Sequence, residues 1–162
     1  MKLVLFRHGE RENAGTSNPP LSLRGLKQAE CLAEWVRSGR LPPPSRLLCS
    51  PKIRTQLTFG ALSKELGLNL QILNELDERV QIESHERFER RVRTALNSLE
   101  QASGVHYLCT HLDWLEVALR HIASDTDLTQ DKYLNCWMPG HFMIFDTSST
   151  PWIFEQMETL SL

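Results

Sequence analysis

The sequence lacks any apolar run long enough to cross a membrane, which takes about 18 to 20 residues. Its N-terminal run "LVLF" is cut off by Arg7 and is also too short for the apolar segment of a secretory signal peptide. We therefore expect neither membrane spans nor a signal peptide, and the sequence predicts a cytoplasmic protein without membrane partners.

Cysteine is scarce and dispersed. The chain has four cysteines, Cys31, Cys49, Cys109 and Cys136, and no CxxC pair. A disulfide-rich secreted scaffold and a compact zinc site both require closer groups of cysteines. We expect all four to be reduced residues of the core.

The sequence also lacks an excess of positive charge. Its 18 Lys and Arg residues against 20 Asp and Glu residues give a net charge of -2 and an isoelectric point near 6.3. This excludes a broad basic surface for nucleic acid, although a small basic pocket remains compatible with it. No repeat, linker or low-complexity segment divides the 162 residues, so we expect one domain over 1–162. The oligomeric state is not indicated.

Hydrophobic periodicity alternates between two patterns along the chain. Short apolar runs predict strands, and apolar residues at three-to-four spacing predict helices. The expected strands are residues 2–6, 46–50, 69–73, 105–110, 141–146 and 151–156, and the expected helices begin at Ser22, Ser50, Ser84 and Asp113. Residues 75–83 show no period and are expected to form a loop. The alternation predicts an α/β fold with antiparallel pairing late in the chain.

Polar residues follow three of these strands. The first strand ends at Arg7 and His8, the second leads to Arg54 in the next helix, and the strand at 105–110 is followed by His111. The carboxyl ends of parallel strands line the ligand crevice of an open α/β sheet. The sequence therefore predicts that two arginines and two histidines meet at one edge.

Such a group of side chains suits a phosphorylated ligand. Arginine donates paired hydrogen bonds to phosphate oxygens, and a neutral imidazole can attack phosphorus. A zinc site made of His8, Cys109 and His111 is the competing interpretation. It has neither a compact ligand spacing nor an evident carboxylate ligand, so we favour the phosphate pocket.

Four segments in order carry a resemblance to a known family. They are "LVLFRHGE" at the N-terminus, "PLSLRGLKQA" (20–29), "CSPKIRTQLT" (49–58) and "YLCTHLDWLEVAL" (107–119). Together they resemble the histidine phosphatase (phosphoglycerate mutase-like) superfamily. The chain length and the "THL" motif are most similar to small SixA-type phosphohistidine phosphatases. The resemblance implies a three-layer α/β/α sandwich with a mostly parallel mixed central sheet.

The same resemblance implies how the pocket works. His8 would be the nucleophile that takes the phosphoryl group, and Arg7, Arg54 and His111 would hold its oxygens. The neighbouring positive charges would help to keep His8 neutral. The implied substrate is a phosphohistidine protein or a small phosphomonoester, and neither a metal nor another cofactor is expected.

The group that protonates the leaving group is less defined by the sequence. Glu75, in the context "LNE", stands where many relatives carry a catalytic glutamate, and we take it as the candidate. Asp77 and Glu78 compete for this role. Asp113, two residues after His111, is a further alternative, although a helix N-cap explains it equally well.

Substrate contacts are expected from three further residues. Gly9 is expected to let the backbone approach the bound anion closely. Arg11 stands where relatives often carry Ser or Thr, and Asn13 lies one position before a common asparagine. Either residue could contact the substrate or could simply be solvated.

Two other functions share the same fold. A mutase would return the phosphoryl group to its substrate, but the short segment between Leu73 and Ser84 leaves little room for a lid that retains the substrate. A catalytically inactive phosphate-binding module is opposed by the presence of His8, Arg7 and Arg54. Hydrolysis is therefore the favoured reaction.

Overall fold

A computed structural model describes residues 1–13, 15–99 and 103–161. Its strands are β1 (Lys2–Arg7), β2 (Arg46–Cys49), β3 (Leu70–Ile72), β4 (Val105–Thr110), β5 (His141–Asp146) and β6 (Ile153–Thr159). Its α-helices are α1 (Leu23–Arg37), α2 (Ile53–Leu66), α3 (His85–Leu99), α4 (Leu112–His121) and α5 (Asp131–Leu134), and a 3₁₀ turn, η1, covers Asn74–Leu76.

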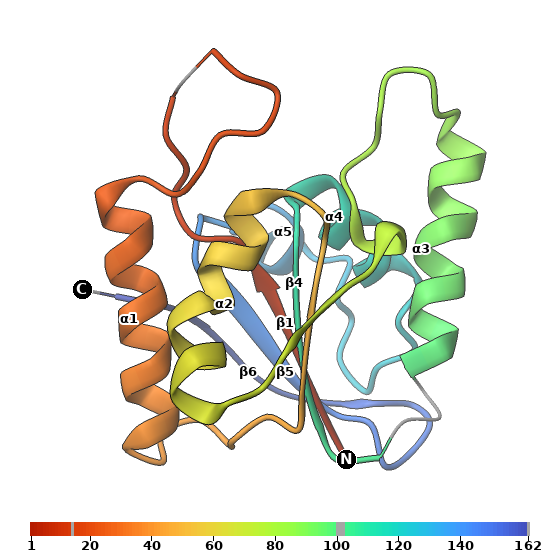
Figure 1. Cartoon of the computed structure of the whole chain (residues 1–162). Coiled ribbons are helices and arrows are strands. Elements are labelled where there is room, and N and C mark those ends of the chain that lie inside the picture. Colours follow the sequence, from red (N-terminus) through yellow and green to blue (C-terminus); the bar gives the residue numbers. More distant parts are fainter. Residues whose placement is uncertain (14, 100–102, 162) are drawn as a thin grey trace.

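The strands form one sheet in the order β3-β2-β4-β1-β5-β6. The four strands from β3 to β1 run parallel, whereas β5 and β6 each pair in antiparallel fashion. This confirms the predicted mostly parallel mixed sheet with antiparallel pairing late in the chain. The sheet lies between helices on both faces (Figure 1).

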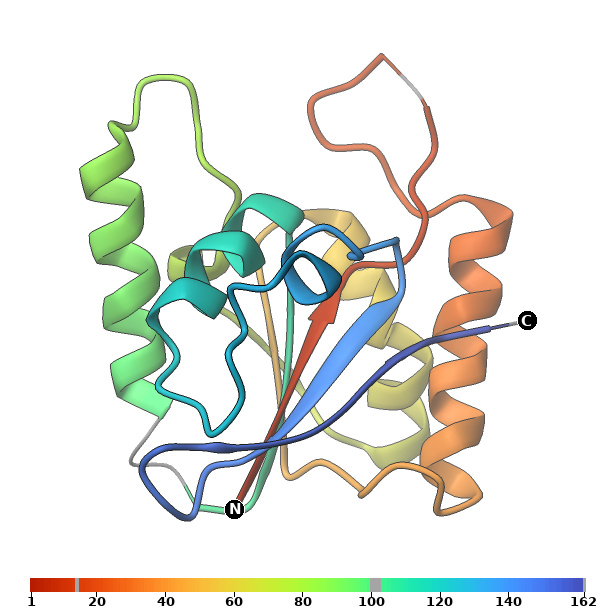
Figure 2. The same cartoon turned by 180° about the vertical axis from the view of Figure 1, so that it is seen from behind.

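Side-chain alternation along β1 divides the core into two layers. Val4 and Phe6 belong to the hydrophobic cluster that α1 and α2 cover, and Leu3 and Leu5 belong to the cluster beneath α3 and α4. Helices α4 and α5 lie in front of the sheet when it is seen from behind (Figure 2). A strand that is apolar on both faces can be buried only between two such layers, so the predicted three-layer sandwich is confirmed.

Helix boundaries follow the predicted signals in two cases. Ser22 caps α1, its hydroxyl accepting from Gly25 N at 3.1 Å. Gly67 ends α2 in the left-handed region, with φ of 65°, where glycine carries no Cβ penalty. The short helix α5 was not predicted, since four residues are too few to show a helical period.

The predicted starts of α2 and α4 are wrong. Helix α2 begins at Ile53 with Lys52 in the N-cap position, and α4 begins at Leu112 with His111 in that position. The Ser50 hydroxyl accepts from Lys52 N at 3.2 Å and also contacts His111. Ser50 therefore serves the turn before α2 and the adjacent strand end, and it does not cap the helix.

The cysteines are only partly as expected. All four are free, and Cys49 and Cys109 are buried opposite one another on β2 and β4. Cys31 is half-buried and Cys136 is exposed, so the prediction of a core position is wrong for Cys136. Among the described residues, no helix combines the length and the apolar character needed to cross a membrane.

Candidate active site

The carboxyl ends of three neighbouring strands, β2, β4 and β1, carry the polar residues singled out from the sequence. Arg7 pairs in register with Thr110, and Cys49 with Cys109, so the residues that follow these strands lie level with one another. The segments before α1 and before α3 both project beyond this edge (Figure 1). The edge is therefore flanked on two sides by surface loops.

His8 is buried at this edge with one ring nitrogen already engaged. Its side chain is 5% exposed, and Nδ1 lies 2.7 Å from the carbonyl oxygen of Gly9. A carbonyl can only accept, so Nδ1 carries the proton and Nε2 retains its lone pair. Arg54 Nε donates to Nε2 at 3.2 Å. The nitrogen suited to nucleophilic attack thus faces a guanidinium group.

Arg54 connects the groups of the site. Besides His8, its guanidinium contacts His111 Nδ1 at 3.1 Å and Glu78 Oε2 at 2.6 Å through Nη2. The side chain is 3% exposed, and Nη1 has no hydrogen-bond partner in the part of the chain that the structure describes. A buried guanidinium N–H without a partner is costly, so Nη1 is available to an anion that enters the site.

His111 is oriented by Arg54 on one side and Ser50 on the other. Because a guanidinium only donates, Nδ1 accepts, and the ring proton lies on Nε2. Nε2 donates to Ser50 Oγ at 2.7 Å, and this hydroxyl lies 3.0 Å from Thr55 Oγ1. Sequence reasoning missed this role of Ser50, because a serine before Pro51 reads as a helix cap.

Both histidines are neutral at pH 7. Burial, opposed by the Gly9 carbonyl and aided by the positive charges of Arg54 and Arg7, lowers the pKa of His8 to about 4. Burial and the Arg54 charge lower the pKa of His111 to about 2. The ring centroids are 5.4 Å apart, so a charge on one ring disfavours a charge on the other. The site therefore holds an unprotonated imidazole beside fixed positive charge.

Two carboxylates lie against this group, and both come from the segment after η1. Glu78 joins Arg54 to Lys52, whose Nζ lies 3.4 Å from Glu78 Oε1. Asp77 lies 3.7 Å from His111 Nε2 and 4.0 Å from Lys52 Nζ. Burial raises the pKa of Asp77, and the Lys52 charge partly opposes this. The carboxylate in contact with the arginine of the site is thus that of Glu78.

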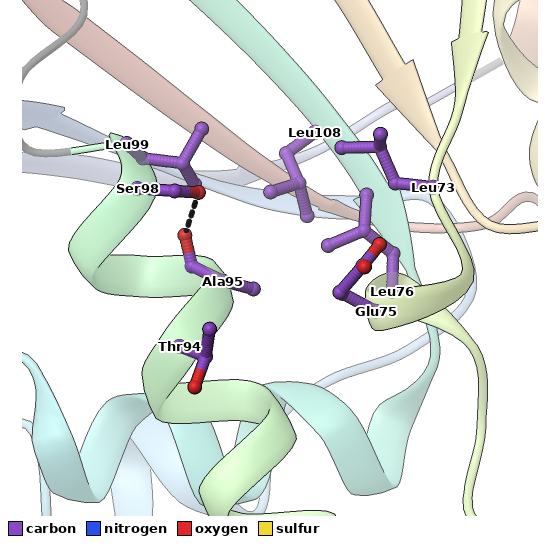
Figure 3. A pocket seen from close by; sticks show the side chains of 8 residues that line it. All are labelled: Leu73, Glu75, Leu76, Thr94, Ala95, Ser98, Leu99 and Leu108. Atoms are coloured by element: carbon purple, nitrogen blue, oxygen red, sulfur yellow. Dashed lines mark hydrogen bonds between the residues drawn. The ribbon is translucent and has the colours of Figure 1, made fainter.

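The structure places Glu75 elsewhere, and its position does not support the predicted role. Its side chain lines a pocket of about 250 Å³ between η1 and α3 (Figure 3). The other residues of this pocket are Leu73, Leu76, Thr94, Ala95, Ser98, Leu99 and Leu108. No hydrogen bond or ion pair within the described residues joins the Glu75 carboxylate to His8, Arg54 or His111.

Asp113 has two structural tasks, and the prediction that it caps the helix is only partly right. It lies in the first turn of α4, and its Oδ2 accepts from the backbone N of Arg79 at 2.8 Å. Its Oδ1 accepts from the backbone N of Trp114 in the same turn at 2.9 Å, although His111 occupies the N-cap position. These bonds occupy both oxygens of the carboxylate that was the further candidate for proton transfer.

Arg7 lies at the end of β1 and is fixed by the loop before β5. Its Nη1 donates to the carbonyl oxygen of Trp137, while its Nε is buried without a partner among the described residues. Burial lowers the pKa of Arg7, and the nearby charge of Arg11 adds to this effect. Arg7 thus supplies positive charge close to both histidines and retains one free donor.

Gly9 is close to another element rather than to open space. Its N–H donates to Thr58 Oγ1 at 3.0 Å, and a Cβ at this position would lie 3.2 Å from the carbonyl oxygen of Gly25 in α1. The missing side chain therefore lets α1 pack against the strand end. Because its N–H is already bonded, Gly9 does not offer that group to an anion, and the close approach of its backbone to the substrate stays a prediction.

Arg11 and Asn13 lie outside the contact network. Both are exposed, and Arg11 forms an isolated backbone bridge with Leu21. The charge of Arg11 makes a minor contribution to the lowered pKa of His8. The geometry brings neither side chain into contact with Arg54 or His111 among the described residues.

The alternative zinc site finds no support in the side-chain geometry. The described residues contain no group of three or more His, Cys, Asp or Glu side chains placed to hold a metal ion. Cys109 is fully buried in the cluster that includes Phe6 and Phe59. Burial raises its pKa well above the ordinary value, which disfavours the thiolate that zinc binds.

A match to a known protein family covers part of the chain that forms the polar edge. Residues 3–81, which contain His8, Arg54 and Glu78, match the model of the histidine phosphatase superfamily (branch 1). This N-terminal part of the chain, from β1 to the segment after η1, is therefore similar to the histidine phosphatase superfamily. No curated protein sequence matches it significantly.

Solved structures share the fold of this chain at low sequence identity. The α-ribazole phosphatase of Shigella flexneri has a TM-score of 0.77 at 18% identity, with 100% of this chain and 98% of the other covered. A phosphoserine phosphatase of Entamoeba histolytica in complex with 3-phosphoglyceric acid has 0.73 at 13%, covering 98% and 96%. The protein histidine phosphatase SixA complexed with tungstate has 0.70 at 16%, covering 99% and 97%. The structures that share this fold therefore include SixA and at least two other kinds of phosphatase.

Proposed function

We propose that this protein is a phosphatase that hydrolyses a phosphorylated substrate through a covalent phosphohistidine on His8. One observation carries the proposal. His8 is neutral, its Nδ1 proton is fixed by the Gly9 carbonyl, and its Nε2 faces the buried Arg54. A nucleophile prepared in this way beside preorganised positive charge suits phosphoryl transfer, in which positioning and electrostatics provide most of the catalysis.

The reaction proceeds in two steps. The Nε2 lone pair attacks phosphorus, an N–P bond forms, and the bond from phosphorus to the leaving group breaks as that group takes up a proton. Water then attacks the phosphohistidine, the N–P bond breaks, and inorganic phosphate leaves while the proton of the water is taken up. Arg7 and Arg54 hold the phosphoryl oxygens in both steps, and His111 joins them when its Nε2 proton turns from Ser50 to the substrate. The proposal therefore requires no metal ion.

Glu78 is the proposed proton donor and acceptor. Its carboxyl group contacts Arg54 at 2.6 Å, which places it beside the expected position of the phosphoryl group. In its protonated form it would donate to the leaving group, and as a carboxylate it would take the proton from water. Asp77 lies farther from Arg54 and takes a supporting place against Lys52 and His111.

The substrate is a phosphohistidine protein or a small phosphomonoester. Similar folds include proteins described as SixA, phosphoserine phosphatase and α-ribazole phosphatase, and this variety supports hydrolysis of phosphate compounds without selecting one of them. The short segment from Leu73 to Ser84 favours release of phosphate over return to the substrate. We also infer a cytoplasmic location, which the four free cysteines support.

Trapping the phosphoenzyme tests the proposal. The protein is mixed with radiolabelled phosphoramidate or p-nitrophenyl phosphate and quenched, and acid-labile protein-bound phosphate is counted together with free phosphate. His8→Asn should abolish both signals, whereas His121→Asn, on the surface of α4, should retain them. A labelled His8→Asn protein would contradict the assignment. Labelled phosphoenzyme that accumulates without release of free phosphate would support a phosphotransferase such as a mutase, and the absence of both signals would support an inactive binding module.

A further inference from the structure

Arg91, on α3, binds the backbone of the segment that carries Asp77 and Glu78, whose Glu75 carbonyl also accepts from Trp114 Nε1 at 2.8 Å. Arg91 Nη1 donates to the carbonyl oxygens of Glu75 at 3.0 Å and Asp77 at 2.8 Å. Longer contacts of 3.4 Å reach the carbonyl oxygens of Asn74 and Glu78. One guanidinium group thus binds four carbonyl groups on both sides of the point where η1 ends.

The guanidinium group is itself fixed in place. Its Nε and Nη2 bind the two carboxylate oxygens of Glu83 at 3.0 and 2.7 Å, and its carbon lies 4.9 Å from the centre of the Phe88 ring. Phe88 and Val92 anchor α3 in the core. The Arg91 hydrogen bond is the main cause of the lowered pKa of Glu83. The donors are therefore presented from a rigid element in a set orientation.

We propose that Arg91 is a positioning residue that holds Glu78 against Arg54. It makes no hydrogen bond or ion pair with His8 or His111 among the described residues, so it acts through the backbone of residues 74–78. Asp113 fixes the same segment from α4 through the Arg79 N–H. The inference rests on the proposed function of Glu78, because its consequence is correct placement of the proton donor.

A lysine cannot take over this task. Arg91 uses three separate nitrogens in a plane to bind the carbonyl groups and the Glu83 carboxylate, whereas an ammonium group has three donors at one point. Arg91→Lys keeps the charge and most of the stem but loses the planar fork. Arg90, the preceding residue, is exposed and makes no side-chain hydrogen bond to a described residue, so Arg90→Lys is the matched control.

Amide hydrogen exchange tests the placement without reference to activity. Arg91→Lys should accelerate exchange at the amides of Leu76, Asp77 and Arg79 by about tenfold, because local opening of the segment becomes easier. The core amides of β1 and β4 should keep their wild-type rates, as should every amide in Arg90→Lys. Unchanged exchange in the segment would overturn the proposal whether or not the protein is a phosphatase.

Leaving-group dependence tests the consequence for catalysis. Arg91→Lys should lower kcat/KM, which reports on transfer to His8 and departure of the leaving group, about 10- to 100-fold for phenyl phosphate, whose leaving group needs a proton. The loss for p-nitrophenyl phosphate should be less than about threefold. In a Glu78→Gln background Arg91→Lys should cause no further loss. Equal losses with both substrates, or a full additional loss in that background, would overturn the positioning role. A wild-type protein that neither forms a phosphoenzyme nor releases phosphate would instead contradict the proposed function.

Discussion

Burial of an uncharged His8 predicts a loss of stability at mildly acidic pH. In the unfolded chain the imidazole titrates near its ordinary pKa of 6.5, whereas in the folded protein burial lowers that pKa to about 4. Between these two values the unfolded state binds more protons, so the free energy of unfolding falls as the pH falls. The effect begins below pH 6.5 and levels off below pH 4.

The size of this effect follows from the two pKa values. Protonation of the unfolded chain lowers the free energy of unfolding by about 2 kcal/mol between pH 7 and pH 5 and by about 3 kcal/mol at pH 4 for His8 alone. Urea denaturation at pH 7, 6 and 5 measures it. His8→Asn, which can still donate to the Gly9 carbonyl but does not titrate, should be less sensitive to pH than the wild type by that amount.

The comparison uses the change with pH, because His8→Asn also alters packing at every pH. An exposed histidine loses little hydration on folding, so His85→Asn should show the wild-type dependence. If the wild type and His8→Asn lost equal stability between pH 7 and pH 5, His8 would not be held uncharged by burial. Burial would then not explain an unprotonated His8 that can attack phosphorus.

Three further outcomes are expected. Gly25→Ala should lower the free energy of unfolding, measured by urea denaturation, by several kcal/mol or prevent folding, since its Cβ would lie 2.0 Å from the backbone oxygen of Glu10. Gly60→Ala is the control: it has open space around it and should change the free energy of unfolding by less than about 1 kcal/mol. Ser50→Ala should lower kcat about tenfold and destabilise the protein by about 1–3 kcal/mol, because the buried His111 loses its acceptor; unchanged kcat would exclude an orienting role. Tyr107→Phe should cost about 1 kcal/mol by urea denaturation and leave kcat unaltered, as it loses one hydrogen bond far from the site.

The fold was largely predictable because its signals are local. The apolar runs at 2–6 and 105–110 have no polar face, and only the central strands of a sheet covered on both sides can bury them. Ser22 at the N-cap indicates the start of helix α1, and the apolar stripe of α3 ends shortly before Gly104. The boundaries of α2 and α4 were less predictable, since the residues that would cap them are used by neighbouring segments.

The convergence of His8, Arg54 and His111 was also foreseeable, because the carboxyl ends of adjacent parallel strands must share an edge. The hydrogen bonds between them were not. Ser50 and Lys52 lie beside Pro51 in the chain, and no local pattern indicates that one would orient a histidine 61 positions away and the other an acid from a different loop. Such contacts depend on the register of the sheet and on the path of the loops.

The different positions of Glu75 and Glu78 have a specific physical origin. The two glutamates are three residues apart, a spacing that would place them on one face of a continued 3₁₀ helix. The turn stops at Leu76, which is 1% exposed and whose carbonyl accepts from Thr110 Oγ1 at 2.6 Å. Asp77 then adopts an extended conformation, with φ of -72° and ψ of 155°. That single change of backbone direction leaves Glu75 facing α3 and brings Glu78 to Arg54, so a three-residue motif match alone does not show which carboxylate lies beside the arginine.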